Sequence, residues 1–189
     1  GSEMCIRDRY KAGLNKNIPI IPRAEMLSEL MRFKKGIAVA GTHGKTSTTS
    51  ILASILSEGK LDPTFVIGGR INSMKANAKL GTGELFVVEA DESDASFLHL
   101  NPVSTILTNI DKEHLETYQG DFERLKATYL DFIHQVPFYS NVFLCIDDDE
   151  VRKLIPSILR PIVTYGLSGK AHIQACLLYT SDAADDTPC

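Results

Sequence analysis

The sequence of 189 residues predicts an α/β fold in which a mostly parallel sheet is flanked by helices. The first observation is that short apolar runs alternate with stretches in which apolar residues recur at helical spacing. Continuous apolar runs are typical of strands that are buried on both faces, as they are in parallel sheets. The second observation is a glycine-containing turn at residues 41–44, which joins one apolar run to a helical stretch, as expected for a β–α unit.

The first predicted helix covers residues 23–33, where Met26, Leu27, Leu30 and Phe33 have helical spacing. The apolar run at 36–40 predicts a buried strand, because it is too short for a helix and contains no polar residue. A second helix is predicted over 47–56, after the glycine turn. Its buried side is expected to consist of Ile51, Leu52, Ile55 and Leu56.

Asp62-Pro63 predicts a turn, and the next four residues, Thr64-Phe65-Val66-Ile67, predict a strand that ends at Gly68-Gly69. Residues 70–83 are small and polar with little periodicity, which indicates a surface loop at the ligand end of the sheet. The remaining strands are predicted at 85–88, 103–108, 142–146 and 162–165, and the remaining helices at 122–133 and 148–159.

The two ends differ from the middle of the chain. Residues 1–9 and 176–189 resemble translated sequencing adapters, so we interpret them as non-native tails and leave them out of the fold prediction. The alternative is that they are genuine terminal segments. Residues 10–35 are interpreted as an approach segment followed by a helix, and residues 36–175 as one domain that is incomplete at its C-terminal end.

Composition narrows the function classes. A net charge of −4 without a basic face argues against nucleic-acid binding. No apolar run approaches the roughly 18 residues of a membrane span, and no signal peptide is recognisable. The four cysteines have neither C-x-x-C nor zinc-finger spacing, and Cys145 lies in an apolar run, as a reduced core residue would. We therefore expect a cytoplasmic protein.

The turn has the composition of a phosphate-binding loop. It reads Gly41-Thr42-His43-Gly44-Lys45-Thr46-Ser47 and lies between a predicted strand and a predicted helix. Such a turn can direct backbone N–H groups and the positive end of the helix dipole at one anion. Lys45 adds a positive charge for a phosphate, and the Thr46 hydroxyl adds a hard oxygen for Mg²⁺. The usual first glycine is replaced by Val39, so the motif is shortened; an ordinary glycine turn is the alternative.

Two further strands end in polar residues at the same edge of the sheet, where open parallel sheets bind their ligands. Glu89 is the first polar residue after the run 85–88 and is placed to bind a Mg²⁺ held by phosphates. His114 follows Asn109 and Asp111 beyond the next strand, and the sequence alone leaves open whether it binds a metal or substrate or is an ordinary surface histidine.

Other polar residues remain undecided at this point. Asp91, Glu92 and Asp94 fit a solvated acidic loop as well as a functional one. The His43 imidazole could contact a substrate or simply shape the turn.

Three blocks of the sequence resemble the Mur ligases. They are the loop at 41–49, the segment Glu89-Ala90-Asp91-Glu92-Ser93-Asp94-Ala95-Ser96-Phe97 and the segment Thr108-Asn109-Ile110-Asp111-Lys112-Glu113-His114. The similarity covers residues 18–175 with the blocks in family order. It implies the central, P-loop NTPase-like domain of a three-domain ligase, which lacks most of the other two domains here.

The resemblance implies ATP-dependent addition of L-alanine to UDP-N-acetylmuramic acid through an acyl phosphate, in peptidoglycan precursor synthesis. Gly41, Thr42, His43, Gly44, Lys45, Thr46 and Ser47 would bind the phosphates of ATP, and Asn109 would orient the adjacent turn. Thr46 and Glu89 would bind one Mg²⁺ and His114 a second, with Lys45, Glu89 and His114 as the catalytic residues. Several relatives carry a carbamylated lysine near the positions of Thr128 and Tyr129; the nearest lysine here is Lys126, and we assign it no role.

Rival hypotheses remain. The chain could be a nucleotide-binding module without turnover, a Mur-type ligase for a recycled tripeptide, or an unrelated GTPase or kinase. The GTPase hypothesis lacks an N-K-x-D segment for reading the base, since Asn109-Ile110-Asp111 does not supply one. A folate-type polyglutamate ligase would share the loop but not the block at 89–100.

Overall fold

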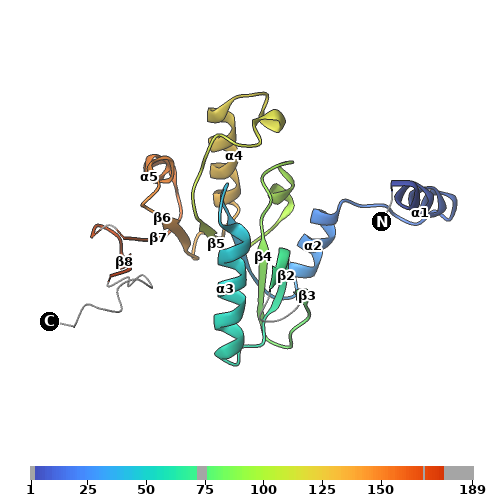
Figure 1. Cartoon of the computed structure of the whole chain (residues 1–189), viewed down its shortest axis with the longest axis horizontal. Helices are drawn as coiled ribbons and strands as arrows, with labels where there is room; N and C mark the ends of the chain where they lie inside the picture. The colour runs from blue at the N-terminus through green and yellow to red at the C-terminus, as the bar shows by residue number, and fades with distance from the viewer. Residues whose placement is uncertain (1–2, 72–75, 168, 177–189) are drawn as a thin grey trace, which may run out of the picture.

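The computed structural model describes residues 3–71, 76–167 and 169–176 and contains one sheet of eight strands in the order β3-β2-β4-β1-β5-β6-β7-β8 (Figure 1). Every neighbouring pair is parallel except β2 and β3. This confirms the predicted mostly parallel sheet. The strands are β1 Lys35–Ala40, β2 Thr64–Ile71, β3 Ala76–Lys79, β4 Leu85–Glu89, β5 Ser104–Leu107, β6 Val142–Cys145, β7 Ile162–Gly166 and β8 Ile173–Gln174.

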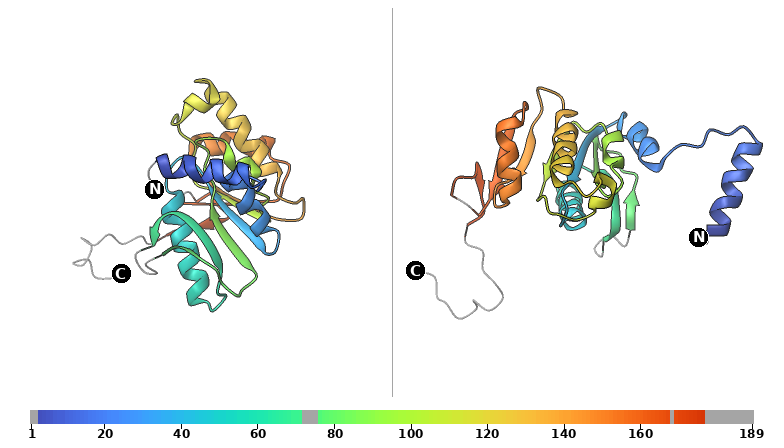
Figure 2. Two further views of the ribbon diagram at one scale, coloured as in Figure 1. Left: turned by 90° about the vertical axis from the view of Figure 1, so that its right-hand side faces the viewer. Right: turned by 90° about the horizontal axis from the view of Figure 1, so that it is seen from above.

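Helices lie on both faces of the sheet (Figure 2). One face carries α3, and the other carries α2, α4 and α5, whereas α1 stands apart from the sheet in Figure 1 and in the right-hand view of Figure 2. The α-helices are α1 Glu3–Asn15, α2 Arg23–Met31, α3 Lys45–Glu58, α4 Phe122–His134 and α5 Asp149–Leu154. The 3₁₀ helices are η1 Ser96–His99, η2 Leu115–Tyr118 and η3 Ile155–Ser157.

The larger part of the core lies on the face covered by α4. Phe97 of η1 packs between Tyr129 and Phe132 of α4, with ring centroids 5.5 and 4.8 Å away. All three side chains are buried to 99% or more, and burying such a side chain is worth about 1.5–3 kcal/mol. The Asp121 carboxylate caps α4 by accepting a hydrogen bond from the Glu123 N–H. These contacts fix η1 and α4 against the strand ends that carry the predicted site.

Helices α2 and α3 bury faces other than the predicted ones. On α2 the buried residues are Leu27, Ser28 and Met31, while three of the four predicted ones are exposed: Met26, Leu30 and Phe33. On α3 Thr49 and Ala53 lie against the sheet, and Ile51 and Ile55 are about 60% exposed. Small side chains let the α3 backbone approach the strands closely, so the isoleucines, two positions away, point outward. Leu52 and Leu56 pack at the edge of this contact, as predicted.

Other elements also differ from the prediction, either in their bounds or because they were not predicted. β2 continues to Ile71, and part of the predicted loop at 70–83 is strand β3, because the two pair as an antiparallel hairpin. The helix predicted over 148–159 ends earlier, at a 3₁₀ turn that contains Pro156, which lacks the N–H that an α-helix requires. β8 was not predicted, since a strand of two residues has no periodicity. Helix α1 crosses the predicted boundary at residues 9 and 10.

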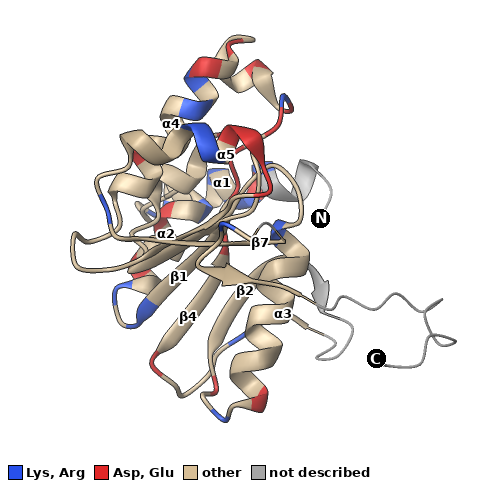
Figure 3. Cartoon of the chain, turned by 90° about the vertical axis from the view of Figure 1, so that its left-hand side faces the viewer, with Lys and Arg blue, Asp and Glu red and all other residues tan. Residues whose placement is uncertain are grey.

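Charged residues of both signs are spread over the helices and loops (Figure 3). Four consecutive acidic residues, 147–150, lead into α5. Among the described residues, no helix is long and apolar enough to cross a membrane. The predicted tail at 176–189 lies outside the described residues except for Cys176.

Candidate functional site

The predicted phosphate loop joins the carboxyl end of β1 to the first turn of α3. Gly41 and Gly44 both have positive φ angles, of 132° and 77°. Gly44 is the residue before α3 and provides no side-chain cap, so the first N–H groups of the helix remain available to a ligand. Lys45, Thr46 and the exposed Ser47 form that first turn. The local structure is that of an anion site at a helix N-terminus.

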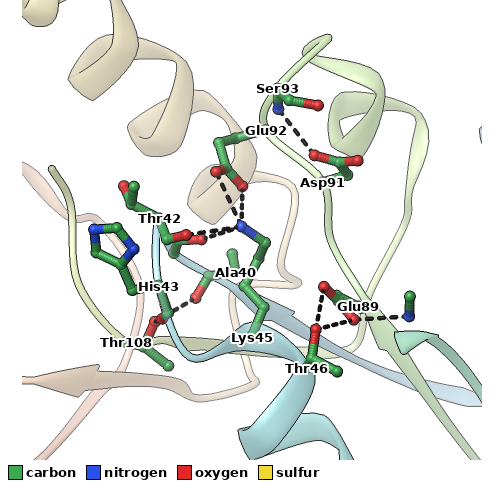
Figure 4. A network of polar contacts seen from close by, with 12 residues as sticks. Ala40, Thr42, His43, Lys45, Thr46, Glu89, Asp91, Glu92, Ser93 and Thr108 are labelled. Atoms are coloured by element: carbon green, nitrogen blue, oxygen red, sulfur yellow. Dashed lines mark hydrogen bonds and ion pairs between the residues drawn. The ribbon is translucent and has the colours of Figure 1, made fainter. Parts of the chain in front are cut away.

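The loop is attached to the end of β5 by hydrogen bonds from several residues. The Asn109 side chain accepts from the His43 N–H at 2.8 Å and donates to the His43 carbonyl at 3.0 Å. Thr108 Oγ1 donates to the same carbonyl at 2.8 Å (Figure 4). Thr42 Oγ1 accepts from the Asp111 N–H at 2.9 Å. The Asn109 side chain thus holds the loop backbone from the residues that follow β5.

Lys45 points back into the loop and toward the segment after β4 (Figure 4). Its ammonium donates to the carbonyls of Gly41 and Thr42 at 2.7 and 3.1 Å and to Glu92 Oε1 at 3.0 Å. Glu92 Oε2 lies 2.8 Å from the same nitrogen, without the alignment of a hydrogen bond. The Glu92 side chain is 1% exposed and that of Lys45 is 13% exposed, so this ion pair is shielded from water.

Thr46, in the first turn of α3, is hydrogen-bonded to Glu89, the last residue of β4. Thr46 Oγ1 donates to the Glu89 carboxylate, at 2.9 Å from Oε1 and 3.1 Å from Oε2, and the Gly68 N–H donates to Oε2 at 2.8 Å. A hydroxyl and a carboxylate are hard oxygen ligands of the kind that Mg²⁺ prefers. Both groups are half-buried beside the N-terminus of α3, so their chemistry fits a cation shared with bound phosphates.

The two histidines of the prediction are exposed. His114 precedes η2 with a φ of 55° and has no hydrogen-bond or ion-pair partner within the part of the chain that the structure describes. His43 Nε2 lies 3.3 Å from Asp111 Oδ2 and 3.8 Å from Glu113 Oε1. The pKa of Asp111 is lowered, first by the Lys112 N–H and then by His43. No cluster of three or more His, Cys, Asp or Glu residues suited to a metal occurs in the described ranges.

The structure separates the three acidic residues that the sequence could not distinguish. Asp91 accepts from the Ser93 N–H at 3.0 Å and Asp94 from the Ser96 N–H at 2.9 Å, so both stabilise local turns. Glu92 instead points inward to Lys45. No signal in the sequence separates it from its neighbours, because the pairing depends on tertiary structure.

Lys126, the lysine nearest to Thr128 and Tyr129, forms ion pairs with two carboxylates. Its ammonium lies 2.6 Å from Glu123 and 3.2 Å from Glu150. These two carboxylates, Glu123 first, raise the pKa of Lys126 and keep it protonated. Tyr129 is fully buried, and it offers a phenol rather than an amine.

A cavity of about 260 Å³ is lined in part by Glu89. It lies between the N-terminus of α2 and η1. Charged residues line much of it, namely Arg23, Glu89, Asp91 and Asp94. A second group bound there would lie next to the phosphate site.

Sequence comparison finds close relatives. A family model described as the Mur ligase middle domain matches residues 39–186. UDP-N-acetylmuramate–L-alanine ligase from Polaromonas naphthalenivorans is 60% identical over 164 residues, which are 87% of this chain and 34% of that protein. The enzyme of the same name from Legionella pneumophila (strain Corby) is 58% identical over 84% of this chain and 34% of its own length. The chain thus spans about a third of the curated relatives that it matches.

Solved structures show the same fold. A UDP-N-acetylmuramate:L-alanyl-γ-D-glutamyl-meso-diaminopimelate ligase from Neisseria meningitidis matches with a TM-score of 0.72 and 26% identity, over 82% of this chain and 53% of that one. A UDP-N-acetylmuramate–alanine ligase from Thermotoga maritima matches with a TM-score of 0.70 and 29% identity, over 85% and 35%. Together with the loop, the strand order and the family match, these similarities show that the chain belongs to the Mur ligase family, through its middle domain.

Proposed function

We propose that the chain is the middle part of an ATP-dependent ligase that adds L-alanine to UDP-N-acetylmuramic acid. The observation that carries this proposal is the pairing of Thr46 with Glu89 at the mouth of a lysine-containing phosphate loop. The names of the relatives with 58–60% identity favour alanine as the added amino acid. The rival specificity, for a recycled tripeptide, is supported by a structural neighbour with 26% identity.

Each loop residue has a proposed part in binding ATP. The backbone N–H groups from Gly41 to Ser47, at the positive end of α3, would hold the phosphates. Lys45 would place its charge against the β- and γ-phosphates. The rigid attachment of His43 to Asn109 would keep these donors aligned before ATP binds, so that little reorganisation is needed when charge develops.

Thr46 and Glu89 would hold a Mg²⁺ together with phosphate oxygens, and His114 a second cation closer to the acyl group. ATP would transfer its γ-phosphoryl group to the muramate carboxylate and leave as ADP. The amine of alanine would then attack the carbonyl carbon of the acyl phosphate, so that an amide bond forms and inorganic phosphate and a proton are released. The cavity beside Glu89 adjoins the proposed Mg²⁺ site and is lined by one basic residue, Arg23, and three acidic ones, Glu89, Asp91 and Asp94. Positioning and charge neutralisation supply most of the catalysis in phosphoryl transfer.

The remaining domain and site assignments belong to this proposal. Residues 36–175 are taken as the middle domain and 10–35 as the junction that precedes it, with non-native tails at 1–9 and 176–189. Full activity would depend on further domains that bind the uridine nucleotide and alanine.

The test is substitution of Lys45 in the full-length parent enzyme. Lys45→Ala should lower kcat/KM for ligation by about 10²-fold or more, equivalent to ~3 kcal/mol of transition-state stabilisation. Activity within threefold of the wild type would refute the assignment of the loop. Titration with ATP and GTP separates this proposal from an unrelated GTPase, and assays with L-alanine and the tripeptide separate the two specificities.

A further inference from the structure

Glu92 is a buried carboxylate to which the proposed reaction assigns no role. Its side chain is 1% exposed, and its nearest cation is Lys45. Burial raises the pKa of Glu92, and the hydrogen bond and charge of Lys45 oppose that shift. A buried carboxylate remains ionised only when a counter-ion and hydrogen bonds compensate for lost hydration. Glu92 therefore requires the Lys45 ammonium as its counter-ion in order to remain ionised at this buried position.

The ammonium of Lys45 has no spare donor. It carries three N–H groups, and they face three acceptors: the Gly41 carbonyl, the Thr42 carbonyl and the Glu92 carboxylate. A phosphate oxygen that binds Lys45 must therefore displace one of the three. Displacing Glu92 would leave a buried charge unpaired, whereas displacing a carbonyl would release a neutral group.

The backbone of Glu92 is fixed from a different part of the chain. Its carbonyl accepts hydrogen bonds from Tyr118 Oη at 2.5 Å and from the Ala95 N–H at 3.0 Å. Thr117 of the same 3₁₀ helix donates to the Ser93 carbonyl. The Glu92 carboxylate thus lies next to Lys45 on a backbone segment that η2 holds in place by hydrogen bonds.

We propose that Glu92 is a positioning residue for Lys45, a fixed counter-ion that holds the ammonium at the phosphate loop and moderates its attraction for phosphate. The inference rests on the proposed function, since it assigns Lys45 to nucleotide binding. The proposal gives Glu92 a different role from Asp91 and Asp94, whose carboxylates accept hydrogen bonds from nearby backbone N–H groups.

Neutralising Glu92 while keeping its shape tests the proposal. In Glu92→Gln the amide oxygen can still accept from Lys45, but the negative charge beside the phosphate site is lost. We expect the chain to bind the non-hydrolysable analogue AMP-PNP, with Mg²⁺, roughly three- to tenfold more tightly by calorimetry, because Lys45 then keeps its full attraction for the phosphates. Unchanged or weaker binding would contradict the proposal.

Glu84→Gln is the matched control. Glu84 forms a 2.8 Å ion pair with Lys35 at the start of β4, the end of the strand opposite to Glu89. The substitution makes the same change in residue type and net charge and also breaks a Lys–Glu pair. It should leave AMP-PNP affinity within twofold of the wild type. An equal gain in both variants would show a general charge effect and overturn the inference.

Measurements in the Lys45→Ala variant distinguish failure of the proposed function of the loop from failure of the inference about Glu92. There Glu92→Gln should no longer increase AMP-PNP affinity, because the residue acts through the lysine. If Lys45→Ala binds AMP-PNP as well as the wild type, the proposed function of the loop fails. If binding requires Lys45 but Glu92→Gln has no effect, the proposed function stands and only the inference about Glu92 fails.

Thermal unfolding provides a readout that needs no nucleotide. Lys45→Met should lower Tm, because it leaves the Glu92 carboxylate buried without its counter-ion. Adding Glu92→Gln to Lys45→Met should restore much of the loss, since the unpaired charge is then removed. Additive losses in the double variant would show that the two side chains are not coupled and would overturn the proposal.

Discussion

At the scale of single residues, the two glycines of the phosphate loop have different surroundings. A Cβ at Gly41 would lie 2.1 Å from Thr108 Oγ1 and 3.0 Å from the Asn109 carbonyl, in a backbone with φ of 132°. Gly41→Ala should therefore push the loop off the end of β5, and we expect it to lower AMP-PNP affinity by about tenfold or more, since donor alignment is lost. Calorimetric titration measures this loss.

Gly44 is the control for that substitution. Nothing lies within 4 Å of a Cβ at this position, and only its φ of 77° disfavours a side chain. Gly44→Asn should be tolerated better than Gly41→Ala, because asparagine adopts the left-handed region more readily than other non-glycine residues. Equal losses for both variants would argue that conformation alone, and not the contact with Thr108, makes Gly41 necessary.

Glu89 provides the second prediction at this scale. Glu89→Gln keeps the shape of the side chain but removes an anionic oxygen next to Thr46. In the full-length enzyme it should raise the Mg²⁺ concentration required for half-maximal activity more than it weakens ATP binding. The measurement is a pair of Mg²⁺ titrations at saturating ATP; superimposable curves would remove Glu89 from the metal site and make Asp91 the next candidate.

The sequence predicted part of the site because strand ends are recognisable. Glu89 and Asn109 each follow a predicted strand, and parallel strands bring such ends to one edge, where the structure places them beside the loop. Glu92 could not be singled out, because its burial depends on η2 lying over the segment after β4. His114 remains a prediction, since the structure shows only that it is exposed.

At the scale of elements, the hairpin of β2 and β3 is held by an acidic residue before β2. Asp62 accepts hydrogen bonds from Lys79 Nζ at 2.6 Å, from the Thr82 N–H at 2.7 Å and from Thr82 Oγ1 at 2.8 Å. Lys79 belongs to β3, and Thr82 to the loop that leads to β4. These hydrogen bonds lower the pKa of Asp62 well below its usual value, and the bond from Lys79 has the largest effect.

This lowered pKa predicts a pH dependence of stability. A carboxyl whose pKa is lower in the folded state stabilises the fold above its unfolded pKa of about 4, and the contribution declines as the pH falls below that value. Asp62→Asn should therefore lower Tm at pH 7, and the gap from the wild type should narrow between about pH 4 and pH 3. Thermal scans across this range measure it; a gap that does not depend on pH would contradict the assignment.

The elements themselves were predicted better than their buried faces. The pattern of apolar runs located β1, β4, β5, β6 and β7 correctly within a residue or two. The hairpin strand β3 was missed because its sequence, Ala-Asn-Ala-Lys, is polar and pairs only at the edge of the sheet. The face of α3 was misassigned because a close helix–sheet contact selects small residues such as Ala53, which carry little weight in an apolar pattern. Helix α2 buries Leu27 and Met31, and the prediction included only the first of these.

At the scale of the whole molecule, the sheet is more deeply buried on one side than on the other. In β5, β6 and β7 the residues that point to the α4 and α5 side are buried, as for Thr105, Leu144 and Thr164. Their neighbours Phe143 and Val163, which point the other way, are only half-buried. Parallel sheets are normally covered on both faces. An incompletely covered apolar face favours association, so we expect limited solubility of this chain by itself.

The last prediction concerns what the chain can do alone. It spans about a third of the length of the relatives that it matches, and the Mur ligase resemblance places the uridine nucleotide and alanine on other domains. Ligation requires acyl phosphate and amine to be held together, an effect worth up to ~7–11 kcal/mol. We therefore expect no detectable UDP-N-acetylmuramoyl-L-alanine from the chain supplied with ATP, Mg²⁺ and both substrates.

The phosphate loop, by contrast, is held by contacts that all lie within this chain, among β1, α3, the end of β4 and the end of β5. AMP-PNP should therefore bind weakly to the same preparation when titrated in the presence of Mg²⁺, and this binding serves as the control for a folded site. Product formation above the rate of a Lys45→Ala chain would show that the remaining domains are dispensable for catalysis. Binding without turnover is the expected result, because the loop positions phosphate but does not bring the two reacting groups together.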